Sequence, residues 1–390
     1  MTNFEYQGGA LQAEQMAVSQ IADQVGTPLY IYSAARMTDN FRTFANAFAD
    51  LNATLYYAVK ACPNIAVIKL LADLGAGTDI VSGGELEKAL AAGVAAHKIV
   101  FSSVGKTDAE IAAALNASIH QLNVESVPEL RAISRVAQSL GKTAPVTIRV
   151  NPDVQAGTYA KTSTGHKETK FGVEVAQLDE AVQLATTLSN LSFKGFTVHI
   201  GSHVNDYEPF RAAYTRLAEL VKQYQARGVK IERLDLGGGV TIAYDGVKET
   251  TPFSEYADIV HQTVGKLGCE LSFEPGRRIV GDAGILVARV IYVKDTPTKR
   301  FVIVDAAMND LVRPAMYDAR HSIIPVTESN GPTRAATVVG PVCETADLFG
   351  EDYQLPADIK AGDLVAILQA GAYAAAMSSN YNARPLIPEV

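Results

Sequence analysis

Residues 55–64 of the chain read LYYAVKACPN, and this stretch determines how the rest of the sequence is interpreted. Its aromatic and β-branched residues predict a short buried strand, with Lys60 at the carboxyl end. Because burying an ammonium group is costly, a lysine in low-dielectric surroundings has a lowered pKa, and its neutral amine can form a Schiff base with a carbonyl group. The alternative is a strand-end lysine that extends into solvent, which this stretch alone favours.

Two later stretches are candidate phosphate-binding loops, and they reverse that preference. Leu234–Gly239 reads LDLGGG, and Phe273–Arg278 reads FEPGRR. The backbone N–H groups of such a loop can hold a phosphate when an arginine such as Arg277 assists, although a merely flexible turn is the alternative. Glu274 could pair with a neighbouring arginine, and its carboxylate could also face a pyridine nitrogen. Together with Lys60, these features indicate pyridoxal phosphate as the cofactor.

The composition bounds the class of protein. A chain of 390 residues, 48% hydrophobic and 19% charged, is long enough for two globular domains. A net charge of -8 without a basic run argues against a nucleic-acid-binding protein. The three cysteines, Cys62, Cys269 and Cys343, are far apart and form no CxxC pair, which favours a reduced, cytoplasmic setting. With neither a secretory leader nor a membrane-length apolar run, we expect no export and no membrane insertion.

Short apolar strands alternate with alanine-rich helical segments such as 84–92 and 108–116. The expected strands are 55–59, 78–81, 99–101, 119–122, 146–150, 196–200, 234–236 and 271–273. This number of alternating units predicts an α/β protein built on a (β/α)8 TIM-type barrel. An open doubly wound sheet is the rival, but Gly237–Gly239 lacks the GxGxxG spacing of a dinucleotide loop.

A polar residue or a glycine stands at or just beyond the end of each expected strand. These residues are Lys60, Asp79, Ser102, Asn123, Arg149, His199, Gly237 and Glu274. In TIM-type barrels the reactive groups gather at the carboxyl ends of the strands. The regularity therefore predicts one site at that end, and it is stronger than any single motif.

The segments outside the barrel predict a second domain. Near the N-terminus we expect a helix over 11–25, a strand over 29–32 and a helix capped near Ser33. Beyond Asp282 the sequence becomes rich in expected strands, at 284–293, 300–305, 335–340 and 363–369. The expected domains are residues 1–33 joining a β-domain, 34–282 forming the cofactor-binding barrel, and 283–390 forming the C-terminal β-domain.

Two further motifs have open interpretations. Val198–His203 reads VHIGSH, in which the two histidines are separated by a strand end at glycine, so we expect no metal site. His199 either stacks its flat ring on a cofactor or is a histidine satisfied in the core, and the local sequence does not decide. Cys343 follows a strand and is either a small core residue or an acid positioned beside Glu344.

Nine stretches together resemble the diaminopimelate decarboxylases, which share the alanine-racemase-like fold with ornithine and arginine decarboxylases. They read YYAVKACPN, TDIVSGGEL, STGHKETKFG, HIGSH, DLGGGV, EPGRRIV, AAMNDLVRPAMYDA, GPVCETAD and GAYAAAMSSNYNARP. The resemblance extends from Thr27 to Glu389, and only the combination is specific. Tyr159 departs from the histidine of many relatives, and the sequence stops at Val390 inside an expected final strand, which leaves the edge of the β-domain open.

The resemblance implies roles for individual residues. Lys60 would carry the cofactor as a Schiff base, His199 would stack on its ring, and Cys343 would donate a proton across a homodimer interface to the partner's barrel. The cofactor-binding residues implied are Lys60, Asp79, His199, Ser202, Gly238, Gly239, Glu274, Gly276, Arg277 and Tyr373. The substrate-binding residues implied are Arg277, Arg313, Tyr317, Glu344 and Tyr373.

The reaction implied is the decarboxylation of meso-2,6-diaminopimelate to L-lysine and carbon dioxide, the last step of lysine biosynthesis. Arg313 bears on the substrate, because a distal carboxylate can accept hydrogen bonds from a guanidinium whereas a distal amine alone is repelled. For Arg313 the alternative is a pair with Asp310 or Asp318 on a surface helix. The alternative functions are decarboxylation of ornithine or D-lysine, amino-acid racemisation, and a catalytically silent pyridoxal-binding regulator.

Overall fold

The computed structural model describes residues 4–155, 164–165, 169–245 and 252–390. The chain divides into two compact units. One, here called the barrel unit, comprises Phe41–Thr241 and Thr250–Gly276. The other, here called the β-unit, comprises Met1–Asn40, Ile242–Glu249 and Arg277–Val390.

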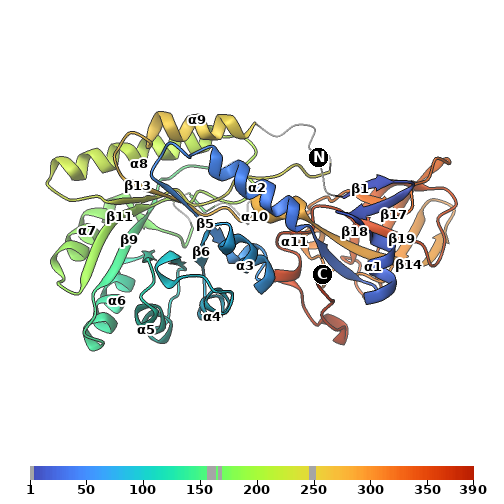
Figure 1. The fold of residues 1–390 in the computed structure, drawn as a ribbon, viewed down its shortest axis with the longest axis horizontal. Helices are drawn as coiled ribbons and strands as arrows, with labels where there is room; N and C mark the ends of the chain where they lie inside the picture. The colour runs from blue at the N-terminus through green and yellow to red at the C-terminus, as the bar shows by residue number, and fades with distance from the viewer. Residues whose placement is uncertain (1–3, 156–163, 166–168, 246–251) are drawn as a thin grey trace. The chain divides into compact units, whose positions relative to one another are not determined.

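Parallel strands close into a barrel in the barrel unit, which confirms the predicted fold (Figure 1). They are β5 (Ala53–Ala58), β6 (Gly77–Ile80), β7 (Ile99–Ser102), β8 (Gln121–Val124), β9 (Ala144–Asn151), β11 (Leu191–Thr197), β12 (Arg233–Asp235) and β13 (Glu270–Phe273). The last strand pairs with the first through Leu271 and Ala53, which closes the ring. Two expected strands have displaced ends. Strand β8 begins at Gln121 instead of residue 119, and β11 ends at Thr197 instead of residue 200.

Helices cover the outside of the barrel (Figure 1). They are α3 (Ile65–Asp73), α4 (Gly83–Ala91), α5 (Asp108–Ala117), α6 (Val127–Ser139), α7 (Leu178–Thr187), α8 (Glu208–Ala226) and α9 (Phe253–Thr263). Ser82 caps α4 by accepting a hydrogen bond from the Glu85 N–H, and Glu85 Oε2 accepts one from Val81 N at 2.7 Å. Such reciprocal bonds fix the segment between a strand end and the next helix, where the predicted site lies.

A seven-stranded sheet forms the core of the β-unit. Its strands are β4 (Leu29–Tyr32), β14 (Gly284–Asp295), β15 (Arg300–Val304), β16 (Ile323–Pro325), β17 (Thr333–Val339), β18 (Leu348–Pro356) and β19 (Leu364–Ile367). Strand β4 pairs antiparallel with β14 and is therefore part of this sheet. At the other end of the chain, Val390 N donates to Tyr30 O at 3.0 Å, so the last residue lies beside β4.

The helix expected over residues 11–25 was wrong in its first half. Strands β1 (Phe4–Gln7), β2 (Ala10–Ala13) and β3 (Met16–Ala17) form a small antiparallel sheet, and α1 spans only Val18–Val25. The chain reverses at Glu14, whose φ of 57° is incompatible with a continuous helix. Strands β16 and β18 and the helices α10 (Arg277–Val280) and α11 (Arg313–Tyr317) were not predicted.

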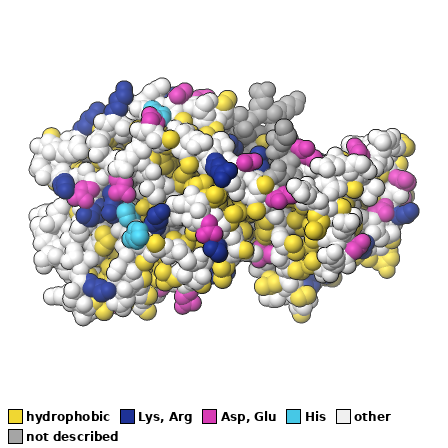
Figure 2. Space-filling view, viewed as in Figure 1, with side chains coloured by type: hydrophobic (Ala, Val, Ile, Leu, Met, Phe, Trp, Pro, Cys, Tyr) yellow, Lys and Arg dark blue, Asp and Glu magenta, His cyan; other side chains and the backbone are white. Residues whose placement is uncertain are grey.

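Within the described ranges, no helix combines the length and the apolar character that crossing a membrane requires. On the face drawn in Figure 2, basic and acidic side chains are interspersed among polar and apolar ones.

Candidate active site

Lys60 lies in a single 3-10 turn, Val59–Ala61, directly after β5. Its Nζ donates to Oδ2 of Asp79, on the neighbouring strand β6, at 2.9 Å. The Asp79 side chain is 0% exposed whereas that of Lys60 is 36% exposed. The Lys60 side chain is therefore only partly buried, and a buried carboxylate orients its amine. The alternative of a lysine directed simply to solvent does not fit this ion pair.

His199 follows β11 and has a defined protonation state. Its Nδ1 accepts a hydrogen bond from the Gly238 N–H at 3.1 Å, so this nitrogen carries no proton. Loss of hydration, and then the charges of Arg149 and Lys60, lower the pKa of His199 well below its ordinary value of 6.5. The ring is consequently neutral and flat, as required for stacking on an aromatic cofactor.

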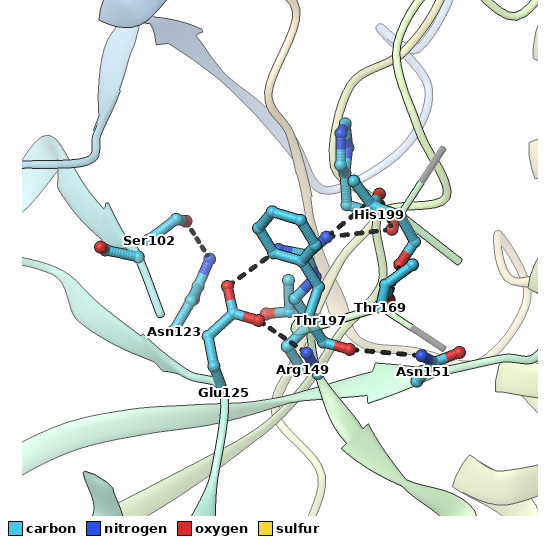
Figure 3. Close-up of polar contacts among 12 residues, drawn as sticks. Ser102, Asn123, Glu125, Arg149, Asn151, Thr169, Thr197 and His199 are labelled. Atoms are coloured by element: carbon cyan, nitrogen blue, oxygen red, sulfur yellow. Dashed lines mark hydrogen bonds and ion pairs between the residues drawn. The ribbon is translucent and has the colours of Figure 1, made fainter. Parts of the chain in front are cut away.

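The backbone at His199 is held by a buried ion pair (Figure 3). Arg149 Nη2 donates to the His199 carbonyl at 3.1 Å, and Thr164 Oγ1 donates to the same oxygen at 3.0 Å. Glu125 orients the guanidinium, since its Oε1 accepts from Arg149 Nη1 at 2.8 Å and its Oε2 accepts from Gly172 N at 2.8 Å. Arg149 was expected at this end of the barrel, but Glu125 was not.

The triple glycine between β12 and α9 is dictated by close packing. A side-chain Cβ on Gly237, whose φ is +65°, would lie 2.6 Å from Val198 O and 2.8 Å from His199 Nδ1. A Cβ on Gly238 would lie 2.3 Å from Glu274 O. The loop is therefore not merely a flexible turn: only glycine lets its backbone pass between His199 and Glu274.

Glu274 follows β13 and belongs to a buried carboxyl cluster. Its Oε1 accepts from Ser102 Oγ and Asn123 Nδ2, both at 3.2 Å, and Asn123 Nδ2 also donates to Asp235 Oδ2 at 2.9 Å. Burial, followed by the charges of Asp235 and Asp79, raises the pKa of Glu274 well above 4.5. Burial likewise raises the pKa of Asp235 to about 6. The two carboxyl groups are hydrogen-bonded to each other, and burial favours the protonated form of the pair.

We predict that this carboxyl cluster makes the stability of the cofactor-free protein against unfolding depend on pH. Folded Glu274 keeps a proton that the unfolded chain releases above its ordinary pKa of 4.5, so stability is present below that value and is lost as the pH rises towards the raised pKa. Glu274→Gln cannot ionise and should unfold at a higher temperature than the wild type at pH 8, by about 2 to 4 °C for each kcal/mol relieved. At pH 5 the two proteins should differ less.

Scanning calorimetry of the cofactor-free proteins at both pH values measures this effect. The matched control is Glu219→Gln, which changes an exposed carboxylate on α8 and should show no such difference between pH 5 and pH 8. Equal advantages of Glu274→Gln over the wild type at the two pH values would show that Glu274 does not carry the cost.

Two arginines meet around one tyrosine in the β-unit. Arg277 Nη1 donates to the Tyr244 hydroxyl at 2.6 Å, and its Cζ lies 4.7 Å from the centre of the Tyr373 ring. The Cζ of Arg313 lies 4.5 Å from the centre of the Tyr244 ring. Arg313 is 1% exposed, so the alternative that placed it on a surface helix was wrong. Tyr373 has a φ of 58°, which is unusual for a tyrosine. Strained backbone conformations of this kind are concentrated at functional sites.

Cys343 and Glu344 lie on an exposed turn between β17 and β18. The buried carboxylate of Asp347 shapes this turn, because it accepts from Val342 N at 2.7 Å and from Met308 N at 2.6 Å. Glu344 is hydrogen-bonded to Tyr381. The alternative that Cys343 is a small core residue was therefore wrong.

The remaining expected residues are placed as follows. Ser202 and Tyr317 are half-buried, and Gly276 is buried. Tyr159, together with residues 163 and 166–168 of the STGHKETKFG stretch, lies outside the described residues. In the part of the chain that the structure describes, no group of three or more His, Cys, Asp or Glu side chains could hold a metal ion.

Comparison with known proteins identifies the family. Residues 34–281 match the family described as pyridoxal-dependent decarboxylase, pyridoxal binding domain. The diaminopimelate decarboxylase of Neisseria meningitidis serogroup B is 48% identical over 97% of this chain and 91% of its own length. This chain belongs to the diaminopimelate decarboxylase family.

Solved structures agree with this membership. The crystal structure of diaminopimelate decarboxylase from Helicobacter pylori complexed with L-lysine is 40% identical, with a TM-score of 0.92, over 95% of this chain and 93% of that chain. A lysine/ornithine decarboxylase from Vibrio vulnificus, complexed with putrescine, has a TM-score of 0.84 over 96% of both chains but is only 23% identical, and shares the fold alone. The fold is therefore common to several decarboxylases, whereas the high identity is to the diaminopimelate enzymes.

The family cofactor is pyridoxal phosphate, and the barrel unit has groups that fit it. Lys60 offers an amine for the aldehyde, Glu274 offers a carboxyl proton for the ring nitrogen, and His199 offers a flat neutral ring. Among the described residues, Asp79 Oδ1 is buried without a hydrogen-bond partner. This oxygen can accept a hydrogen bond from a further donor. The cofactor therefore matches the chemistry of the residues present.

Proposed function

We propose that this chain converts meso-2,6-diaminopimelate into L-lysine and carbon dioxide, the last step of lysine biosynthesis. The observation that carries the substrate assignment is the buried guanidinium of Arg313, which is 1% exposed. The relatives of this chain are named diaminopimelate decarboxylase. A solved relative holds L-lysine, the expected product. Decarboxylation of ornithine or D-lysine and racemisation are the alternatives that the experiment below distinguishes.

The barrel residues would hold the cofactor and manage its protons. Bound there, pyridoxal phosphate accepts the electron pair that remains when the carboxylate leaves as carbon dioxide. We propose that Lys60 forms the covalent attachment, that Asp79 orients its amine, and that His199 stacks on the ring. Glu274 would give its retained proton to the ring nitrogen and become a carboxylate beside a cation. The residues proposed for the remaining cofactor contacts are Ser202, Gly238, Gly239, Gly276, Arg277 and Tyr373.

The substrate residues would recognise both ends of diaminopimelate. We propose that Arg313 binds the distal carboxylate and that Glu344 receives the distal amine, with Arg277, Tyr317 and Tyr373 as further contacts. Ornithine and lysine, bound as substrates, lack a distal carboxylate and would leave the buried guanidinium without that partner. Such a mismatch at a built polar site costs several orders of magnitude in kcat/KM.

Carbon dioxide release from a small panel of amino acids tests this function. We expect kcat/KM for meso-diaminopimelate to exceed that for ornithine and for D-lysine by about 10^3-fold or more. Chiral analysis of each amino acid in the same reactions detects racemisation. A preference for ornithine, or racemisation without gas release, would show that the proposed substrate or the proposed reaction is wrong.

The domain limits and the assembly are also proposals. We propose that residues 34–282 form the cofactor-binding domain and that 1–33 join the β-domain of 283–390, which the pairing of β4 with β14 supports.

We further propose a homodimer with shared active sites, because Cys343, the proposed proton donor, is exposed on a single chain. A cytoplasmic location agrees with three cysteines that are all thiols.

A further inference from the structure

His321 is a buried residue of the β-unit to which the proposed reaction assigns no role, and its hydrogen bonds fix its tautomer. Its Nδ1 lies 2.9 Å from Leu368 O, and its Nε2 lies 2.6 Å from Arg313 Nη1. A carbonyl oxygen can only accept, and a guanidinium N–H can only donate. The single ring proton is therefore on Nδ1, and Nε2 presents its lone pair to Arg313.

The surroundings of His321 keep this ring neutral. The side chain is 1% exposed. Burial, and then the charge of Arg313, lowers the pKa of His321 to about 3. A protonated ring would lose its acceptor and place a second cation against Arg313. Near neutral pH the pair is therefore a guanidinium held by an uncharged acceptor.

Tyr244 holds the same guanidinium through its aromatic face. The Arg313 Cζ lies 4.5 Å from the ring centre, and the His321 ring packs against Tyr244 at 5.3 Å between centres, with 80° between the ring planes. The Tyr244 hydroxyl in turn accepts from Arg277 Nη1 at 2.6 Å. One tyrosine thus fixes two arginines, one by its face and the other by its oxygen.

The contacts that His321 Nε2 and the Tyr244 ring make with Arg313 are both with uncharged groups. These two contacts orient the guanidinium and add no negative charge of their own that would compete with an incoming anion. We propose that His321 and Tyr244 are positioning residues that present Arg313 to the distal carboxylate of the substrate. This inference rests on the proposed function.

Two substitutions separate the bond to Arg313 from the bond to Leu368. In His321→Asn the amide nitrogen takes the place of Nδ1 and can still donate to Leu368 O, but no acceptor reaches Arg313. In His321→Gln the longer side chain can place its amide oxygen near the position of Nε2 and accept from Arg313. A histidine that matters only for packing would be replaced about equally well by either.

The experiment uses the cofactor-loaded enzyme and two competitive inhibitors. Decarboxylation removes one carboxylate, so L-lysine retains the distal one, whereas 1,5-diaminopentane has none. His321→Asn should weaken inhibition by L-lysine about 10- to 100-fold, the range expected for a lost hydrogen bond to a charged group, and leave inhibition by the diamine unchanged. The KM for meso-diaminopimelate should rise similarly while kcat changes less. His321→Gln should remain within about threefold of the wild type.

Three results would overturn the inference: equal weakening of both inhibitors, unchanged inhibition by L-lysine, or no rescue by His321→Gln. Arg313→Ala distinguishes this failure from that of the function. If Arg313→Ala keeps the wild-type KM for meso-diaminopimelate, the proposed role of Arg313 is wrong. If Arg313→Ala weakens substrate binding but His321→Asn does not, only the positioning role of His321 is rejected. Should the histidine variants not fold, Tyr244→Leu should selectively weaken L-lysine inhibition, and Tyr244→Phe, which retains the ring face, should do so less. Equal weakening of L-lysine inhibition by Tyr244→Leu and Tyr244→Phe would also reject the proposed positioning role.

Discussion

Lys60→Ala is expected to abolish both decarboxylation and the visible absorbance of the attached cofactor. Lys60 is the residue proposed to attach the cofactor, and its amine donates to the buried carboxylate of Asp79 at 2.9 Å. Removing a covalent-catalysis residue costs kcat roughly three orders of magnitude or more. Absorbance spectra of the purified protein with added pyridoxal phosphate, together with carbon dioxide release, measure the two losses.

A matched lysine makes this result specific. Lys69 lies on α3 only nine residues away, is 61% exposed and pairs with an equally exposed Asp73, so Lys69→Ala should behave as the wild type. Persistent activity in Lys60→Ala would remove Lys60 from the reaction. A wild-type protein that takes up no pyridoxal phosphate would reject both the decarboxylase and the racemase functions.

The barrel part of this site could be predicted from sequence because of a simple geometric rule. The carboxyl ends of parallel strands meet at one end of a closed barrel, so residues far apart in the chain, such as Lys60 and Glu274, are brought to the same end by strand order alone. A polar side chain after an apolar run is visible in the sequence. No knowledge of contacts is needed to group such residues.

The supporting residues could not be found in this way. Asp235 is the last residue of β12 and stands between two leucines, so in the sequence it is seen only as an acidic residue within the run LDL. Glu125, Tyr244 and His321 act through partners distant in sequence, such as Arg149 for Glu125 and Arg277 for Tyr244. Their roles depend on tertiary packing, which neither periodicity nor local spacing encodes.

Mixing two inactive variants should restore activity if the active site is shared between subunits. Lys60→Ala lacks the proposed cofactor-attachment lysine, and Cys343→Ala lacks the proposed proton donor. In a hybrid dimer, one site would combine the intact Lys60 of one subunit with the intact Cys343 of the other. Random exchange of equal amounts gives half hybrids, each with one of its two sites intact, so about one quarter of the wild-type activity is expected.

The exposure of Cys343 is the reason to expect this behaviour. Closed active sites shield their reacting groups from bulk water, yet the turn that carries Cys343, the proposed donor, is open to solvent on a single chain. A second subunit that covers the turn resolves this contradiction. Lys60→Ala mixed with the double variant Lys60→Ala/Cys343→Ala is the control, and it should stay inactive because no subunit carries Lys60. Absence of complementation after subunit exchange has been demonstrated would place both groups on one chain, and full activity of Cys343→Ala alone would exclude this thiol as the donor.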